Sequence, residues 1–194
     1  METVSIERNT KETRISLSLK IDGVGESSID TSVPFLDHMI NQISQHGFFD
    51  VKIKAVGDTA IDFHHTVEDC GIALGQAFKA ALGDKKGLAR FGHASIPLNE
   101  ALASVSVDCS GRPFFVFKGD IPKGKIGDFD AELIEEFLQA FANSAGLTLH
   151  VKVEHGTNLH HIAEAVFKSL ARALDAATRR EPRSVGVPST KGVL

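Results

Sequence analysis

The sequence predicts an α+β fold built from two similar halves, residues 1–90 and 91–194, that form one compact unit. Two observations support this prediction. The strand and helix patterns of the first half return in the same order in the second, and the motif H-H-x-x-E occurs twice, beginning at His64 and at His160. Self-similarity of this kind indicates an ancient duplication. We therefore expect a pseudo-dimer in which each half has a mostly antiparallel sheet and two helices.

The first half alternates between the periodicities of strands and helices. Residues 12–21 alternate apolar and polar side chains, as a half-buried strand does. Residues 34–46 carry an apolar stripe with a helical repeat, and Gly47 provides a stop signal for that helix. Strand-like alternation returns in 48–56, and a second helix is expected over about 65–82.

The second half repeats this order and ends in a loop. Strand-like runs at about 101–109 and 113–118 precede a helix at about 130–145. A strand over 147–155 and a helix over about 160–177 follow. Both halves therefore place an H-H-x-x-E motif at the start of their last helix.

Composition excludes several classes of protein. The chain has 194 residues, a net charge of −4 and no run of more than two consecutive Lys or Arg residues, which argues against a nucleic-acid groove. No stretch is apolar enough for a membrane span, and the first residues do not form a signal peptide. The two cysteines lie apart in apolar runs, as is typical of a reducing compartment. We expect a cytoplasmic protein that binds neither nucleic acid nor membrane.

The spacing within H-H-x-x-E points to metal binding. His64 and Glu68 are four residues apart and share one helix face, whereas His65 lies about 100° around the helix from His64. Adjacent imidazoles cannot easily converge on one ion. Each motif therefore serves two metals, or one metal and a substrate, with ligands exchanged between halves or between subunits. His38 and Glu136 occupy matching places early in the preceding helices and are the natural additional ligands.

Imidazole and carboxylate ligands together suit Mn, Fe, Zn or Ni. Three acidic residues flank the ligands, Asp37, Asp62 and Asp69. They are candidates for orienting the imidazoles as hydrogen-bond acceptors, and solvated surface carboxylates are the competing interpretation.

Motifs along nearly the whole chain resemble those of the imidazoleglycerol-phosphate dehydratase family of histidine biosynthesis. They are T-K-E-T-R-I at 10–15, F-L-D-H-M at 35–39, H-G-F-F-D at 46–50, D-F-H-H-T-V-E-D at 62–69, R-F-G at 90–92, G-R-P-F-F-V-F at 111–117, T-L-H at 148–150, N-L-H-H-I-A-E-A-V-F-K at 158–168 and P-S-T-K-G-V-L at 188–194.

This resemblance implies two Mn²⁺ ions per active site and a ribosomal protein S5 domain 2-like fold. It also implies trimers that assemble into a 24-subunit particle with metal sites at subunit interfaces. The implied ligands are His38, His64, His65, Glu68, Glu136, His160, His161 and Glu164. Many relatives have His where this chain has Glu136, but a carboxylate is chemically competent there.

The implied reaction is dehydration of D-erythro-imidazole glycerol phosphate to imidazole acetol phosphate, through a metal-bound imidazolate and a diazafulvene intermediate. A metal on the substrate imidazole would lower the pKa of its N–H, and a second would help the hydroxyl leave. The resemblance makes Glu12 the acid/base for the carbon-bound proton, although by spacing alone it is an ordinary outward-facing strand residue. His38, Glu68 and Glu164 would share the catalytic centre.

The resemblance also nominates residues that contact the substrate. Besides Glu12 they are Arg90, Arg112, Lys168, Ser189, Thr190 and Lys191. Gln45 and His46, at the end of the first predicted helix, are candidate contacts to the glycerol hydroxyls. Cations and hydroxyls would bind the phosphate, and the tail 188–194 would fold over the substrate. Lys168 has independent support because it lies one turn after Glu164 on the same predicted helix.

Two other functions use the same ligands. One is a dinuclear metallohydrolase, in which bound hydroxide attacks a phosphate or amide. The other is a non-catalytic metal-binding oligomer for storage or sensing. The first would usually need more bridging carboxylates, and the second leaves Glu12 and the basic residues without a role.

Overall fold

The computed structural model describes residues 1–194. The elements of the first half are β1 (Val4–Asn9), β2 (Thr13–Lys20), β3 (Ser27–Asp30), α1 (Pro34–Gly47), β4 (Asp50–Gly57) and α2 (His64–Leu82). Those of the second half are β5 (Phe91–Leu98), β6 (Ala101–Asp108), β7 (Phe114–Lys118), β8 (Lys125–Ile126), β9 (Phe129–Asp130), α3 (Leu133–Ala145), β10 (Thr148–His155) and α4 (Leu159–Thr178).

The two main sheets have the same topology. Their strand orders are β1-β2-β4-β3 and β5-β6-β10-β7. In each, the outer strand β3 or β7 runs parallel to its neighbour, and the other pairs are antiparallel. The small β8–β9 hairpin has no counterpart in the first half. The matching topology confirms the predicted α+β pseudo-dimer of two similar halves.

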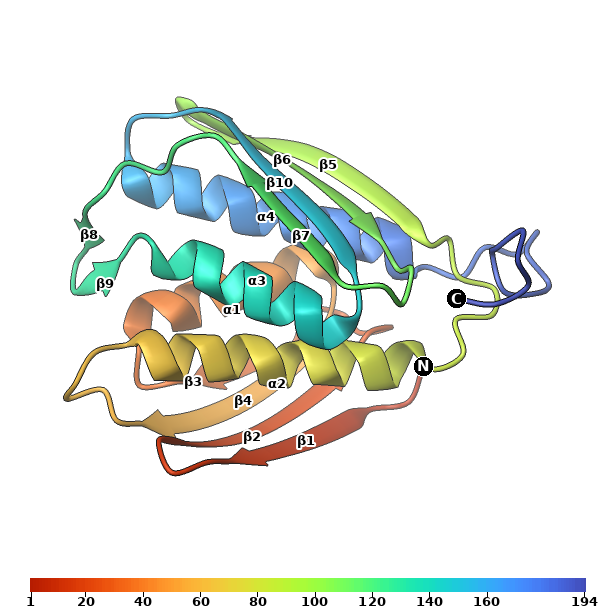
Figure 1. Ribbon diagram of the computed structural model, residues 1–194, viewed down its shortest axis with the longest axis horizontal. Coiled ribbons are helices and arrows are strands. Elements are labelled where there is room, and N and C mark those ends of the chain that lie inside the picture. Colours follow the sequence, from red (N-terminus) through yellow and green to blue (C-terminus); the bar gives the residue numbers. More distant parts are fainter.

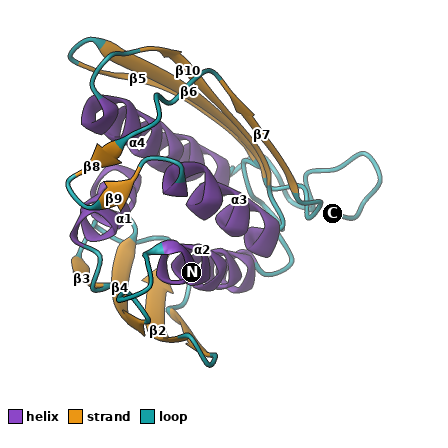
Figure 2. Cartoon of the chain, turned by 60° about the vertical axis from the view of Figure 1, so that its left-hand side comes forward, coloured by secondary structure: helices purple, strands orange, loops and turns teal.

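The four helices lie between the two sheets, which form the outer layers (Figure 1). Helix α2 packs on α3 and α1 on α4, so each helix pair joins the two halves. Figure 2 shows these layers from another side. One cluster of 47 buried hydrophobic residues contains side chains from both sheets and all four helices. None of the helices combines the length and the apolar character that a membrane span requires.

Two glycines allow α2 and α3 to approach closely. A Cβ atom at Gly75 would lie 2.6 Å from the Phe141 carbonyl oxygen, and one at Gly71 would lie 2.8 Å from that of Phe137. Only glycine leaves room for this backbone contact. The contact holds the first turns of the two helices near one another.

The sequence prediction missed several strands. It contained neither β1 nor β3, nor the long strand β5 that opens the second half. The three lie at sheet edges, and no side chain of β1 or β3 is fully buried. An edge strand with so little burial gives only a weak apolar alternation. The helix expected at 130–145 begins instead at Leu133, because residues 129–130 belong to β9.

Candidate metal centre

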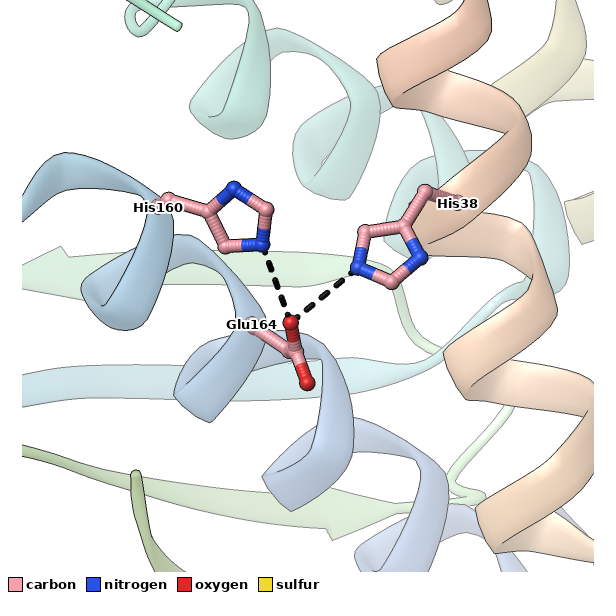
Figure 3. Close-up of side chains that lie close together, drawn as sticks. All are labelled: His38, His160 and Glu164. Carbon is pink, nitrogen blue, oxygen red and sulfur yellow. Dashed lines mark hydrogen bonds and ion pairs between the residues drawn. The ribbon is translucent and has the colours of Figure 1, made fainter. Parts of the chain in front are cut away.

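Three potential ligands meet where α1 and α4 pack together. Glu164 Oε2 lies 3.1 Å from His38 Nε2 and 3.1 Å from His160 Nε2. Figure 3 shows both imidazoles pointing at this carboxylate. His38 comes from the first half, and His160 and Glu164 come from the second. We call these three residues the α1–α4 cluster.

A second triad lies where α2 and α3 pack together. It consists of His64 and Glu68 from α2 and Glu136 from α3, with one ligand atom of each residue within 4.8 Å of those of the others. We call it the α2–α3 cluster. In the duplicated fold Glu136 takes the place of His38, and His64 and Glu68 take those of His160 and Glu164. Each cluster therefore combines residues from both halves, one of the two kinds of exchange that the motif spacing left open.

The first histidine of each motif lies in the first turn of its helix, where backbone N–H groups need acceptors. Asn158 caps α4 by accepting from the backbone N–H groups of His160 and His161. The side chain of Asp62 accepts a hydrogen bond from the backbone N–H of His64. These contacts fix the backbone from which the histidines project.

The prediction that Asp37, Asp62 and Asp69 orient imidazoles is wrong. Asp37 accepts from the backbone N–H and hydroxyl of Thr31. Asp69 is buried and accepts from Arg8 and Thr13, while Asp62 contacts the backbone. All three carboxylates accept hydrogen bonds from local groups, and none of them is hydrogen-bonded to an imidazole.

Each motif's second histidine points away from the first. The rings of His64 and His65 are 6.2 Å apart and nearly perpendicular, and those of His160 and His161 are 6.4 Å apart. His65 Nδ1 lies 3.0 Å from Asp58 Oδ2, and His161 Nδ1 lies 2.7 Å from an oxygen of Glu100.

Asp58 and Glu100 were not identified from the sequence. The signal that could have found Glu100 is its position, since like Glu12 it is the last residue before the second strand of its sheet.

Glu12 occupies the β1–β2 hairpin beside the α2–α3 cluster. Its side chain is 53% exposed, and its Oε1 lies 3.9 Å from His65 Nε2. Backbone N–H groups of Glu12 and Thr13 donate to the Thr10 hydroxyl, and Thr13 in turn donates to buried Asp69. The loop is thus tied to α2, while the Glu12 carboxylate faces an open hollow of about 360 Å³ that Asp58 also lines.

Lys168 and His46 lie beside the α1–α4 cluster. Lys168 Nζ is 2.7 Å from Glu164 Oε1. Burial alone would raise the pKa of Glu164, but hydrogen bonds from Lys168, His38 and His160 lower it to about 2. Burial, with Lys168 nearby, lowers the pKa of His46 and favours its neutral form. Gln45, the neighbour of His46 in sequence, is bonded elsewhere, because its side-chain amide donates to the Gly25 carbonyl oxygen.

The other predicted phosphate contacts lie far from both clusters within one chain. The backbone N–H of Arg90 donates to the carbonyl of Ala177, near the end of α4. His160 is at the start of that helix, so a rise of about 1.5 Å per residue separates the two ends by roughly 25 Å. The Arg90 guanidinium binds Asp108 and the Pro188 carbonyl, which fixes the start of the tail 188–194 at this far end.

The rest of the predicted phosphate group lies in the same region. Figure 1 shows the carboxy-terminal tail, with Ser189, Thr190 and Lys191, at the end of the molecule opposite the β8–β9 hairpin. The exposed Arg112 follows β6 at that end, close to the chain terminus, because Gly111 lies beside Leu194. The structure therefore groups Arg90, Arg112 and the tail with one another and not with the metal clusters of the same chain.

The donor atoms of the two clusters fit a hard or borderline divalent ion. Each offers imidazole nitrogen and carboxylate oxygen within a few ångströms, and neither includes a thiol. This combination suits Mn²⁺ and its first-row neighbours.

Comparisons with known proteins show which family the chain resembles. Residues 31–174 match the family model described as imidazoleglycerol-phosphate dehydratase. The protein of that name from Pelobacter propionicus is 60% identical over 192 residues, covering 99% of this chain and 98% of its own length. The one from Geobacillus kaustophilus is 56% identical, with 97% of each chain covered.

Solved structures of the same enzyme share the fold. The crystal structure of the Staphylococcus aureus enzyme superposes with a TM-score of 0.84 at 38% identity, covering 92% of this chain and 99% of that one. The Pyrococcus furiosus enzyme, in complex with (S)-C348, also has a TM-score of 0.84, at 37% identity, with 97% of this chain and 100% of that one covered.

Proposed function

Since the chain belongs to the imidazoleglycerol-phosphate dehydratase family, we propose that its two clusters hold the two Mn²⁺ ions of a dehydratase centre. Family membership makes the chain a hydro-lyase of histidine biosynthesis. The proposed reaction converts D-erythro-imidazole glycerol phosphate to imidazole acetol phosphate and water. The observation that carries the proposal is the pair of matching triads, each built from both halves of the duplicated fold.

Eight residues would hold the metal. Six form the two clusters, and the other two are His65 and His161, whose rings point away from those of His64 and His160. When bound, the ions would supply Lewis acidity that lowers the pKa of the substrate imidazole and polarises the leaving hydroxyl. The ligands are His38, His64, His65, Glu68, Glu136, His160, His161 and Glu164.

We propose Glu12 as the group that accepts the carbon-bound proton. Its carboxylate forms no ion pair with a lysine or arginine, and its position beside His65 puts it at the edge of the metal centre. A half-exposed carboxylate on a tethered hairpin can reach a substrate in the adjacent hollow. General acid–base catalysis by such a group typically contributes 10²–10⁴-fold to the rate.

Phosphate binding supports a site shared between subunits. Within one chain Lys168 lies at the α1–α4 cluster, whereas the other predicted phosphate contacts lie at the opposite end, namely Arg90, Arg112, Ser189, Thr190 and Lys191. If all of them bind one substrate, the second group must come from a neighbouring chain. We therefore propose the trimers and the 24-subunit assembly that the family resemblance implies.

We also propose a cytoplasmic location, supported by two buried, unpaired cysteines.

Product analysis tests the reaction. Purified protein incubated with imidazole glycerol phosphate and Mn²⁺ should form imidazole acetol phosphate without releasing phosphate. Release of inorganic phosphate in its place would indicate the metallohydrolase. Tight metal binding with no product of either kind would indicate the storage or sensing oligomer.

Mixing two defective variants tests the shared site. His160→Ala lacks a ligand at the metal end, and deletion of 188–194 removes the tail at the other end. Alone, the deletion should raise KM and lower kcat. Co-assembled, the two variants should regain part of the lost activity, because some sites then combine an intact metal end with an intact tail. Absence of any recovery would contradict a site shared between chains.

A further inference from the structure

The Glu100 side chain connects the β5–β6 turn to the first turn of α4. Its Oε1 accepts hydrogen bonds from the backbone N–H of Asn158 at 2.8 Å and from the backbone N–H and hydroxyl of Thr157, both at 3.3 Å. Its Oε2 lies 2.7 Å from His161 Nδ1. One oxygen is therefore held by three donors, and the other faces a single ring nitrogen.

This contact determines which nitrogen of His161 carries the proton. An ionised carboxylate only accepts hydrogen bonds, so Nδ1 must be the protonated nitrogen of the neutral ring. The lone pair is then on Nε2, the atom left free for a ligand bond. A carboxylate on the far nitrogen also fixes the ring's orientation, and such partners tune metal affinity.

The first half achieves the same result with a different residue. His65 Nδ1 lies 3.0 and 3.2 Å from the two oxygens of Asp58, in the loop after β4. No backbone N–H group donates to either of these oxygens. The carboxylate at the hairpin position of the first half is Glu12. Because Asp58 contacts His65 Nδ1, Glu12 is not needed to fix the tautomer of that histidine.

We propose that Glu100 is a positioning residue that selects the Nδ1-protonated form of His161 and aims Nε2 at a metal ion. The proposal rests on the proposed function, because it requires His161 to be a ligand. It assigns no contact between Glu100 and the substrate. It also explains why the equivalent hairpin residues Glu12 and Glu100 have different contacts in the two halves.

Glu100→Gln gives a sharp test, because the three donors to Oε1 orient the new amide. Its oxygen should stay on Thr157 and Asn158, which places the –NH₂ group against His161 Nδ1. That nitrogen must then accept, the proton moves to Nε2, and the ligand atom is blocked. Glu100→Ala removes all contacts of the carboxylate with Thr157, Asn158 and His161, but it leaves both neutral tautomers of His161 accessible.

The measurement is Mn²⁺ binding, followed by the electron paramagnetic resonance signal of the free ion, together with the Tm of the metal-free protein. We expect Glu100→Gln to lower the affinity for one of the two Mn²⁺ ions about 10–100-fold. Glu100→Ala should lower this affinity less. For Tm the order should reverse, with Glu100→Ala the less stable.

Asp58→Asn should change affinity less than Glu100→Gln, because its free amide can turn its oxygen toward His65. Glu7→Gln, on the outer face of the first sheet, is the control for removing a surface charge.

If Glu100 only held the β5–β6 turn against α4, the affinities and Tm values would follow a different pattern. Affinity would then follow Tm, and Glu100→Ala would be the worse variant in both measurements. That result, or unchanged Mn²⁺ binding in Glu100→Gln, would overturn the proposal. Wild-type protein that binds no Mn²⁺ would overturn the metal centre itself, and this role with it.

Discussion

The α1–α4 and α2–α3 clusters are two versions of one site, and they differ in charge. His38 in one corresponds to Glu136 in the other. Lys168, one turn after Glu164, corresponds to Ile72, one turn after Glu68. The α1–α4 cluster thus has one carboxylate paired with an ammonium group, whereas the α2–α3 cluster has two carboxylates and one imidazole.

This difference shows how a duplicated fold can separate two tasks. The ligands keep equivalent positions on the helices, so both clusters survive the divergence of the two halves. Because the α2–α3 cluster is richer in negative charge, we expect it to bind a hard cation more strongly. The α1–α4 cluster carries a cation suited to an anionic substrate group. Glu12 and Glu100 show the same division at the hairpins, since one carboxylate is free and the other is held by four donors.

The largest effect should come from the free hairpin carboxylate. Glu12→Gln should lower kcat by about 10²–10⁴-fold, because an amide cannot accept the carbon-bound proton. Mn²⁺ stoichiometry should stay the same, since Glu12 is not a proposed ligand. Steady-state kinetics with metal analysis checks both. A variant with wild-type turnover would contradict the assignment of Glu12.

Removing the residue that distinguishes the clusters should have the next largest effect. Glu136→Ala takes away one of the three donors of the α2–α3 cluster, and it should weaken the binding of one Mn²⁺ ion by at least the roughly 10–100-fold that the loss of an outer-shell partner costs. Glu136→His would give the α2–α3 cluster the donors of the α1–α4 cluster and should restore binding. Metal titration of the two variants beside His38→Ala provides the check. Full retention of both ions by Glu136→Ala would remove Glu136 from the ligand set.

The cation at the α1–α4 cluster should matter mainly for substrate binding. A hydrogen bond to a charged group contributes about 1.5–3 kcal/mol, so Lys168→Met should raise KM about tenfold or more. Ile72→Lys is the matched variant, because it places a cation one turn after Glu68 and should weaken Mn²⁺ binding there. Equal KM for Lys168→Met and wild type would show that Lys168 does not contact the phosphate.

The smallest effect concerns acid stability. In the metal-free protein the pKa of Glu164 is lowered from 4.5 to about 2. Stability from this group is therefore present above pH 4.5 and is lost as pH falls from about 4.5 to 2, by about 1–3 kcal/mol. Urea unfolding of metal-stripped protein across this range should show a shallower loss in Lys168→Met than in wild type. Identical slopes would mean that Lys168 does not stabilise the carboxylate.

Regular patterns made most of the fold predictable. The apolar stripes of 34–46 and 160–177 correspond to α1 and α4, and the two H-H-x-x-E motifs lie at the starts of α2 and α4. The weakly patterned edge strands β1, β3 and β5 were missed, since edge strands need few buried side chains.

The surroundings of the ligands were harder to predict. Asp37, Asp62 and Asp69 are neighbours of ligands in sequence but bind other groups, whereas Asp58 and Glu100 reach the imidazoles from separate loops. Such contacts depend on how a hairpin meets a helix, and no local spacing encodes that. The location of Arg90 and the tail at the far end likewise became evident only from the length and direction of α4.

The most direct test of the dinuclear centre is a titration of chelator-stripped protein with Mn²⁺, in which bound metal and turnover of imidazole glycerol phosphate are measured on the same samples. We predict no turnover without metal and two ions bound per chain at saturation. The α2–α3 cluster should fill first, and activity should rise only as the second ion binds. Full turnover in metal-free protein, or maximal activity with a single ion per chain, would contradict the account.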